Sequence, residues 1–341
     1  MQQRDVSIDD VARAAGVSPA TVSRALNGRA GVRDDVRARV QLVADGLGYR
    51  PNRAAKHLAG GRTSIIGLVL AGTSLVDDPY SAALVQSVAG AAGAVDEGLM
   101  LILDSRQPDE AVRHLVRDGL VEGIMISAPT VKDRWIEELL DAEMPTILIG
   151  AHPLRLDVPV VDVESLEASA HMVDHLLASG CRRVGTITGP LDRVDAMLRL
   201  DGYELAHRRR GLTVDAGLII EGAFTYESGR RAADRLLAED VDAIYAANDQ
   251  MACAVLDRAL ELGIDVPHTL SVAGFDGIAR DLPDRMTLST IEQPLRELGR
   301  RAVTTLVDLI RGIAAPSHQI IEPRLRLGST TRSIGADDGA T

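Results

Sequence analysis

The chain has 341 residues, of which 46% are hydrophobic and 25% are charged. This length exceeds the roughly 100–200 residues of a typical domain, so we expect two or three domains, and the composition excludes wholesale disorder and collagen-like repeats. No apolar run reaches the roughly 18 residues that a membrane-spanning helix needs, and the charged N-terminal segment lacks the apolar core of a signal peptide. The two cysteines, Cys181 and Cys253, lack the spacing of a disulfide framework or a zinc site. We therefore expect a cytoplasmic protein with no metal and no other cofactor.

The net charge of −12 is distributed unevenly along the chain. Residues 1–62 carry eleven basic and six acidic side chains, a net charge of +5, which leaves −17 for the remainder. Because a local positive field can bind a polyanion despite an acidic total, this asymmetry indicates a basic N-terminal module attached to an acidic body. A basic face that is merely solvated explains the same charge count equally well.

The pattern of residues 7–47 predicts three short helices. Ser7 can cap the first helix, Gly16 can end it, and Ser18 can cap the second. The third helix is expected from about Asp34 to Leu47, where apolar residues recur at helical spacing.

The first two predicted helices have helix-turn-helix spacing. Ala12 permits a close helix crossing, Gly16 makes the turn, and Val22 fixes the second helix against the first. The second helix then presents Pro19, Ala20, Ser23 and Arg24 outward. Arg24 can pair bidentately with guanine in a DNA major groove. A helical hairpin without any ligand is the alternative interpretation of this spacing.

From Thr63 onward, apolar runs of strand length alternate with helical stretches. The runs are Ile65–Ala71, Leu99–Leu103, Ile124–Ile126, Thr146–Ile149, Val184–Ile187, Ala243–Ala246 and Ser271–Gly274. Such alternation predicts parallel sheets that are covered by helices on both faces. About ten strands over roughly 270 residues predict two doubly wound sheets rather than one.

The stretches TVSRALNG and GYRPNRAAKHLAGGRTSIIGLVL closely resemble the LacI/GalR family of bacterial transcription regulators. The resemblance continues through Asp78-Pro79-Tyr80, Gly123–Ile126, Ala247-Asn248-Asp249 and Val272–Asp276, and so covers nearly the whole chain. It implies an all-α helix-turn-helix headpiece and an α/β periplasmic-binding-protein-like body made of two doubly wound parallel-sheet subdomains. The implied domains are the headpiece 1–50, a hinge helix and linker 51–62, an N-terminal effector-binding subdomain 63–163 and 292–322, a C-terminal effector-binding subdomain 164–291 and 323–333, and a loose tail 334–341.

The resemblance also implies which residues bind DNA. It makes residues 52–59 a hinge helix that pairs with its twin on DNA, with Leu58 inserted into the minor groove. An apolar side chain on a short basic helix is suited to unstack and bend DNA, although Leu58 could instead pack against the body. The expected DNA-binding residues are Ser18, Pro19, Ala20, Thr21, Ser23, Arg24, Asn27, Tyr49, Asn52, Arg53, Ala55, Lys56 and Leu58. Arg33 departs from the family pattern, because a Ser or Thr commonly caps the third helix there, and this puts a hydroxyl contact to phosphate in doubt.

A small-molecule cleft between the two subdomains is implied as well, and ligands of such sheets bind at the carboxyl ends of the strands. The expected effector-binding residues are Tyr80, Ser127, Arg199, Phe224, Asn248, Asp276 and Gln293. Among them, Arg199, Asn248 and Asp276 offer donors and acceptors for the hydroxyls of a sugar or nucleoside.

Structural roles remain open for the same residues. Asp276 and the pair Asn248-Asp249 could each cap a helix, and Arg199 could form a surface ion pair. Phe224 could belong to the core. Gln293, where we expect the chain to cross back between the subdomains, is the weaker candidate.

The sequence contains no phosphate-binding loop, dinucleotide-binding spacing or nucleophile elbow, so we do not expect an enzyme. It predicts a homodimeric repressor that binds palindromic operator DNA and responds to a small-molecule effector, with a sugar favoured over a nucleoside. Two alternatives are a transporter-type solute-binding receptor and a DNA-binding regulator controlled by a protein corepressor.

Overall fold

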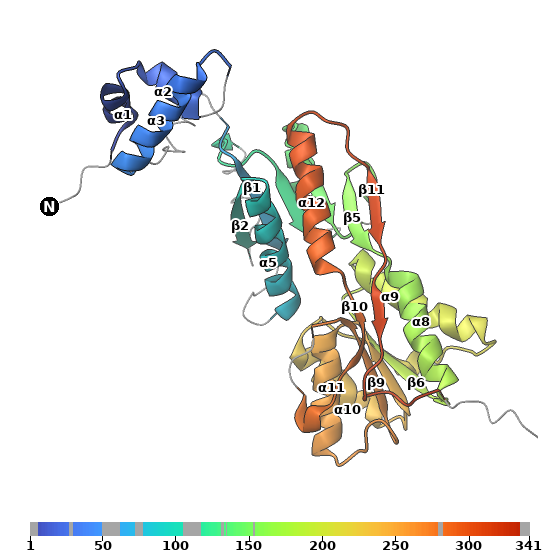
Figure 1. The fold of residues 1–341 in the computed structure, drawn as a ribbon. Helices are drawn as coiled ribbons and strands as arrows, with labels where there is room; N and C mark the ends of the chain where they lie inside the picture. The colour runs from blue at the N-terminus through green and yellow to red at the C-terminus, as the bar shows by residue number, and fades with distance from the viewer. Residues whose placement is uncertain are drawn as a thin grey trace, which may run out of the picture. The chain divides into compact units, whose positions relative to one another are not determined.

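The computed structural model of the protein describes residues 6–26, 30–49, 62–71, 78–104, 117–130, 133, 135–152, 154–278 and 282–334. The chain divides into two compact units, Met1–Thr63 (unit 1) and Ser64–Thr341 (unit 2). The described part of unit 1 consists of helices, whereas unit 2 contains two β-sheets (Figure 1). The predicted hinge helix lies outside the described residues.

Unit 1 contains the three helices that the sequence predicts. They are α1 (Ile8–Ala15), α2 (Pro19–Leu26) and α3 (Asp34–Leu47). Ser7 caps α1 in a reciprocal box, in which its hydroxyl accepts the Asp10 N–H and the Asp10 carboxylate accepts the Ser7 N–H. Gly16 ends α1 with φ +66°, a left-handed conformation that glycine adopts without steric cost. The Ser18 hydroxyl accepts the Thr21 N–H at the start of α2, so the predicted caps are confirmed.

A small apolar core holds the three helices together. Its fully buried members are Val11, Ala12, Ala15, Val22, Ala25, Val40 and Ala44. Ala12 and Val22 are therefore inside, as the helix-turn-helix spacing predicts. The Arg37 guanidinium adds a hydrogen bond from α3 to the Ala25 carbonyl of α2.

Unit 2 contains two six-stranded sheets of matching topology. Sheet A has the order β11 (His318–Ile321), β5 (Val160–Val163), β4 (Thr146–Ile149), β3 (Ile124–Ser127), β1 (Ile65–Ala71), β2 (Gly98–Asp104). Sheet B has the order β12 (Arg324–Arg326), β10 (Ser289–Glu292), β9 (Ser271–Asp276), β8 (Ala243–Ala246), β6 (Val184–Thr188), β7 (Ile219–Glu221). All neighbouring strands are parallel except β10 and β12. The prediction of two doubly wound sheets is confirmed.

Helices cover both faces of each sheet, as buried parallel strands require. On sheet A, α5 (Pro79–Ala94) and α12 (Leu295–Ile310) lie side by side on one face, and α7 (Trp135–Asp141) packs on the other (Figure 1). On sheet B, α10 (Tyr226–Leu237) and α11 (Asp249–Glu261) cover one face, and α8 (Ser165–Ala178) and α9 (Val194–Arg209) cover the other. Two short 3₁₀ turns lie between these elements: η1 (Ala216–Leu218) precedes β7, and η2 (Pro283–Arg285) lies between β9 and β10. None of the helices described is long and apolar enough to cross a bilayer.

The chain passes between the two sheets three times. The first crossing runs from β5 to α8, the second from β10 to α12, and the third from β11 to β12. Gln293 lies in the second crossing, as the sequence predicts. The Glu164 N–H donates to the Ile321 carbonyl at 3.0 Å, which ties the first crossing to the third. Because strands of both sheets end at these crossings, the carboxyl ends of the two sheets face one another.

Gly202 shows how closely α8 and α9 approach. A Cβ atom at Gly202 would lie 2.4 Å from the Leu166 carbonyl oxygen and 2.6 Å from the Ser169 Cβ. We expect Gly202→Ala to lower the free energy of unfolding by about 1–3 kcal/mol, since a backbone oxygen cannot move aside cheaply. Urea unfolding followed by circular dichroism measures this loss.

Gly46 provides the matched control, because it also lies in a helix but has no atom within 4 Å of an added Cβ. We expect Gly46→Ala to be neutral or to stabilise unit 1 by up to about 1 kcal/mol. An unchanged unfolding midpoint for Gly202→Ala would contradict the close packing of α8 on α9.

Candidate functional site

One face of α2 is exposed and carries the side chains that the sequence assigns to DNA. Ser18, Pro19, Ala20, Ser23 and Arg24 are exposed, and Thr21 is half-buried. The opposite face, with Val22 and Ala25, is buried in the core of unit 1. The α2 surface thus resembles that of a recognition helix, with small side chains in its first turn and an arginine further along.

Of the remaining predicted DNA-binding residues, the structure describes Tyr49 but not the others. Tyr49 packs half-buried against the core of unit 1, and this burial raises the pKa of its phenol. At the N-cap of α3, Arg33 makes no capping hydrogen bond and instead pairs with Asp35 through two contacts of 3.1 and 2.7 Å. Asn27, Asn52, Arg53, Ala55, Lys56 and Leu58 lie outside the described residues.

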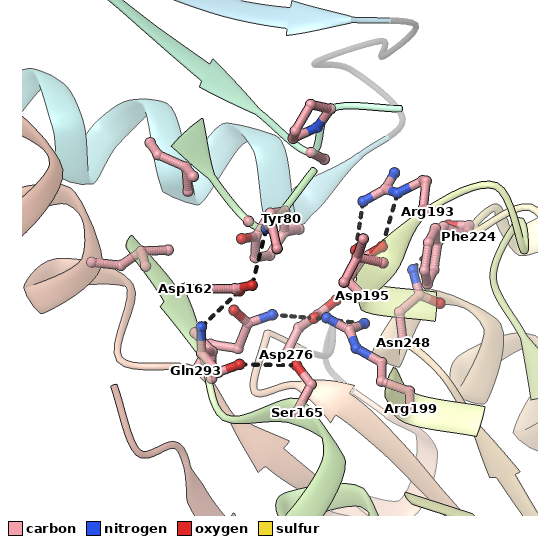
Figure 2. A pocket seen from close by; sticks show the side chains of 18 of the residues that line it. Tyr80, Asp162, Ser165, Arg193, Asp195, Arg199, Phe224, Asn248, Asp276 and Gln293 are labelled. Atoms are coloured by element: carbon pink, nitrogen blue, oxygen red, sulfur yellow. Dashed lines mark hydrogen bonds and ion pairs between the residues drawn. The ribbon is translucent and has the colours of Figure 1, made fainter. Parts of the chain in front are cut away.

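Unit 2 contains a cavity where the carboxyl ends of sheets A and B face each other (Figure 2). It encloses about 670 Å³, including its open mouth. Six of the predicted effector-binding residues line it: Tyr80, Arg199, Phe224, Asn248, Asp276 and Gln293. Ser127 does not line this cavity, because it is the last residue of β3 and is 5% exposed, and the wall is formed by the two residues that follow it, Ala128 and Pro129.

The sequence reasoning did not single out five other polar residues in the wall, namely Asp78, Asp162, Ser165, Arg193 and Asp195. Arg193 and Asp195 follow β6, just as Asn248 follows β8. These two strands are neighbours in sheet B with β7 on the outer side of β6, so they flank the point where the strand order reverses. Ligands of open α/β sheets bind at this point, and the same rule applied to the end of β6 would have identified Arg193 and Asp195.

Arg199 contributes a buried positive charge to the cavity wall. Its side chain, on α9, is 6% exposed as a residue, and its guanidinium carbon lies 3.8 Å from the centre of the Phe275 ring. Nη1 donates to the Ala247 carbonyl at 2.5 Å and lies 3.7 Å from the Asp276 carboxylate. Nε is buried and has no hydrogen-bond partner. Arg199 is therefore not the surface ion pair that the sequence left open, and it retains a donor that a ligand can use.

Asp276 faces Arg199 from the end of β9 and is tied to the second crossing. Gln293 donates to Asp276 twice, from its side-chain amide to the carboxylate at 2.7 Å and from its backbone N–H to the carbonyl at 3.1 Å. The backbone of Asp276 has φ +115°, an unusual value for a residue with a side chain, and such strain tends to occur at functional sites. Burial raises the pKa of Asp276 to about 8, against the opposing effect of the Arg199 charge.

Arg193 and Asp195 form a bidentate ion pair beside Phe224, with N–O distances of 3.0 and 2.6 Å (Figure 2). Burial opposes ionisation of Asp195, but the charges of Arg193 and Arg199 outweigh it and lower the pKa of Asp195. The Arg193 guanidinium lies 4.7 Å from the centre of the Phe224 ring. Phe224 has φ +58° and covers Gly189, where an added Cβ would lie 2.0 Å from the ring. Phe224 is thus half-buried in the cavity wall and also packs against the core of sheet B.

The wall on the side of sheet A is fixed by hydrogen bonds to backbone groups. The Asp162 carboxylate accepts the Ala151 N–H at 3.0 Å, and burial raises the pKa of Asp162 to about 6. The His152 ring accepts the N–H groups of Leu154 and Arg155 at Nδ1. Its proton therefore resides on Nε2, which donates to the Thr130 carbonyl at 2.9 Å.

Asn248 caps a helix and also lines the cavity. Its side-chain oxygen accepts the Met251 N–H, so it caps α11, as the sequence allowed. Its amide nitrogen donates to the Phe224 carbonyl at 2.9 Å and holds that strained residue in place. Asp249 is buried, and its two oxygens accept from the Thr290 hydroxyl and the Ile278 N–H.

The described residues of the wall offer both hydrogen-bond donors and acceptors. Within the part of the chain that the structure describes, no three His, Cys, Asp or Glu side chains are grouped so that they could hold a metal ion. The arrangement suits a ligand with several hydroxyl groups, which can donate to carboxylates and accept from Arg199.

Comparison with known proteins identifies both units. Residues 7–52 match the family model for bacterial regulatory proteins of the lacI family, and residues 173–331 match the model for a periplasmic binding protein-like domain. Catabolite control protein A of Priestia megaterium is 31% identical over 308 residues, which is 89% of this chain and 92% of that protein.

Solved structures agree. The lac repressor dimer bound to operator and the anti-inducer ONPF has a TM-score of 0.82 at 28% identity, covering 97% of this chain and all of that one. The complex of the transcriptional regulator CelR with cellobiose has a TM-score of 0.75 at 30% identity, covering 95% of this chain and 99% of that one. These matches extend over both the DNA-binding helices and the two-sheet body, and the relatives are named as regulators. The chain belongs to the LacI family of bacterial transcriptional regulators.

Proposed function

We propose that the protein is a homodimeric repressor that binds palindromic operator DNA and whose operator affinity is controlled by a sugar bound between sheets A and B. The observation that carries the effector part of the proposal is the buried Arg199 guanidinium, whose Nε has no partner in the protein. A buried donor without an acceptor is costly, and a ligand oxygen removes that cost.

The DNA-binding part rests on the exposed face of α2. Arg24 stands there without a neighbouring acidic residue on its own helix, and the first turn of α2 has small side chains that fit against base edges. The lac repressor, with which the chain shares its fold, binds operator DNA as a dimer. A dimer places two recognition helices on one face of DNA, so the target is an inverted repeat.

A sugar is the effector class that the cavity chemistry favours. The side chains of Arg199, Asp276 and Gln293 offer both donors and acceptors within a small region, while Phe224 and Tyr80 provide flat faces. The related regulator CelR binds cellobiose. Because the ligand contacts both sheets, its binding favours one angle between them, and this change alters the spacing of the two DNA-binding units in the dimer. The coupling is reciprocal, so operator DNA changes sugar affinity by the same factor.

The direct test is to select inverted-repeat DNA from a random pool with the purified protein and to measure its affinity with and without candidate sugars. Sugar-dependent binding supports the proposal. Binding that no sugar changes, but that a partner protein from the same cell controls, points instead to a protein corepressor.

Arg24 is the residue whose loss separates specific from non-specific binding. We expect Arg24→Ala to weaken binding to the selected inverted repeat at least tenfold, because one arginine–guanine contact is lost in each half-site and each contributes about 1–3 kcal/mol. Binding to scrambled DNA should fall far less. Fluorescence anisotropy at fixed salt measures both.

Arg39→Ala is the matched control, since it removes the same charge from an exposed position on α3. It should weaken binding to both DNAs by the same factor. Equal losses on both DNAs for Arg24→Ala would show that Arg24 does not read bases.

Arg199→Met tests the effector site. We expect the dissociation constant of the best sugar to rise roughly 10- to 100-fold, because hydrogen bonds to a charged group contribute about 1.5–3 kcal/mol. Isothermal titration after a thermal-shift screen of sugars and nucleosides measures this. Arg209→Met, on the exposed end of the same helix where Arg209 pairs with Glu167, should bind the sugar as the wild type does. If Arg199→Met binds equally well, the ligand does not lie in this cavity.

Asp276 gives the ligand-free protein a specific pH dependence. Its pKa of about 8 in the folded state lies above the unfolded value of 3.8, so the proton stabilises the fold below about pH 4. This stabilisation is lost as the pH rises through about 8. We expect Asp276→Asn to flatten the fall in melting temperature between pH 5 and pH 9, as measured by calorimetry. Asp201→Asn, at an exposed site on α9, should follow the wild type, and an equal slope in all three proteins would refute the assignment.

A further inference from the structure

Two backbone segments form part of the cavity wall on the side of sheet A. Ala128 and Pro129 follow β3, and Gly150 and Ala151 follow β4. Because β3 and β4 are neighbours in sheet A, the two segments leave the sheet side by side. None of these four residues has a polar side chain, so their contribution to the cavity depends on where the backbone lies.

His152 links the two segments. It directly follows Ala151, is 6% exposed, and donates from Nε2 to the Thr130 carbonyl of the other segment at 2.9 Å. Its Nδ1 accepts the N–H groups of Leu154 at 3.0 Å and Arg155 at 3.1 Å. Short polar side chains such as Asn and Asp close turns with bonds of this kind, and here an imidazole does so. One ring therefore closes the turn after β4 and ties it to the segment after β3.

The bonds at Nδ1 are incompatible with a charged ring. A neutral imidazole has one donor and one acceptor nitrogen, whereas a protonated imidazole has two donors. A proton on Nδ1 of His152 would face two N–H groups and would remove both bonds. Histidine is the side chain whose charge ordinarily changes between about pH 5 and pH 8. The turn after β4 and the protonated ring therefore exclude each other.

The nearest charge on the same turn is that of Arg155. Its guanidinium pairs with Asp157 at 3.0 Å and with Glu137 of α7 at 3.8 Å. These pairs anchor the far side of the turn to α7, so a change at His152 acts on the Gly150–Ala151 side, which lines the cavity.

Two carboxylates hold the segments on either side of the ring. Asp133 accepts the Thr130 N–H at 2.6 Å and the Trp135 indole N–H at 3.3 Å. Asp162 of β5 accepts the Ala151 N–H at 3.0 Å, and burial raises its pKa to about 6. Since Asp162 changes its charge in the same pH range as a histidine, the effect of His152 has to be isolated by substitution.

We propose that His152 is a positioning residue of the effector site: its neutral ring fixes the sheet A wall of the cavity, and protonation of the ring releases this wall and weakens effector binding. The inference rests on the proposed function, because it assigns a regulation to the same site. It makes the response of the protein to its effector dependent on pH.

Hydrogen exchange of the ligand-free, full-length protein tests the release of the wall. After correction for the intrinsic pH dependence of exchange, we expect the protection of the amides of residues 152–157 to fall at least about fivefold between pH 8.0 and pH 5.5. His152→Asn keeps an acceptor near the position of Nδ1 but has no titratable ring, so its protection should not change with pH. His171→Asn removes an exposed histidine from α8 and should behave as the wild type does.

Trp135 reports on the segment after β3. It is the single tryptophan of the chain, and its indole is bonded to the same carboxylate that holds Thr130. We expect its emission to shift to longer wavelength over the same pH range in the wild type and to remain constant in His152→Asn.

Isothermal titration tests the effect on binding, with the sugar that gives the largest thermal shift in a screen of sugars at pH 8.0. Between pH 8.0 and pH 5.5 its dissociation constant should rise at least about fivefold more in the wild type than in His152→Asn. At pH 8.0, His152→Ala should bind this sugar roughly fivefold more weakly than the wild type, because it lacks the acceptor that closes the turn. His152→Asn should restore most of that loss.

The outcomes separate the two proposals. Equal pH dependence of exchange and binding in the wild type and in His152→Asn overturns the role of His152 and leaves the sugar-binding function standing. A release of the wall that leaves sugar binding unchanged overturns the link between His152 and the site. Failure of every sugar to bind at pH 8.0 contradicts the proposed function and the effect on binding with it, whereas the exchange measurement decides the release of the wall on its own.

Discussion

The guanidinium of Arg199 is held away from water between the ends of two sheets, and its nearest carboxylate, that of Asp276, is 3.7 Å away rather than at hydrogen-bond distance. Burying a charge that is only partly paired costs several kcal/mol, so the rest of the structure must compensate. Stacking on Phe275 and the bond to the Ala247 carbonyl provide part of this compensation. The Nε of Arg199 still has no hydrogen-bond partner in the protein, so this compensation is incomplete.

The cavity is complete only because the two sheets contribute different groups. Sheet B supplies the cations, Arg193 and Arg199, whereas sheet A supplies a wall that is fixed by Asp162 and His152. Strained residues at the wall, Phe224 and Asp276, are each held by a neighbour from another element. Such over-determined local geometry favours one arrangement of the wall.

The sequence predicted the parts of the fold that have strong local signals. Capping side chains and a left-handed glycine define α1 and α2, and long apolar runs define strands such as β1 and β8. The missed strands are short or carry polar residues: β7 and β12 have three residues each, and β12 is exposed throughout. Pairing with β10 rather than intrinsic pattern makes β12 a strand, and pairing of this kind is not visible from local sequence.

The sequence likewise predicted some residues of the site and missed others. Polar residues directly after apolar strands, such as Asn248, could be identified, and they do line the cavity. Ser127 fails the same rule by one residue, since the strand ends before the chain reaches the wall. Asp162 lies within β5 itself, and only the pairing of the sheets shows that its side chain reaches the cavity. The sequence also could not decide between two possible roles of one residue. Asn248, for example, both caps α11 and lines the cavity.

The three crossings also limit what the body can do when a ligand arrives. Three connectors, two of them joined by the hydrogen bond from Glu164 to Ile321, restrict how the two sheets can move relative to one another. Gln293 stands in the second of these connectors and holds Asp276 by two hydrogen bonds. The connectors are thereby coupled to the cavity, because any displacement of Gln293 acts directly on a carboxylate in the cavity wall.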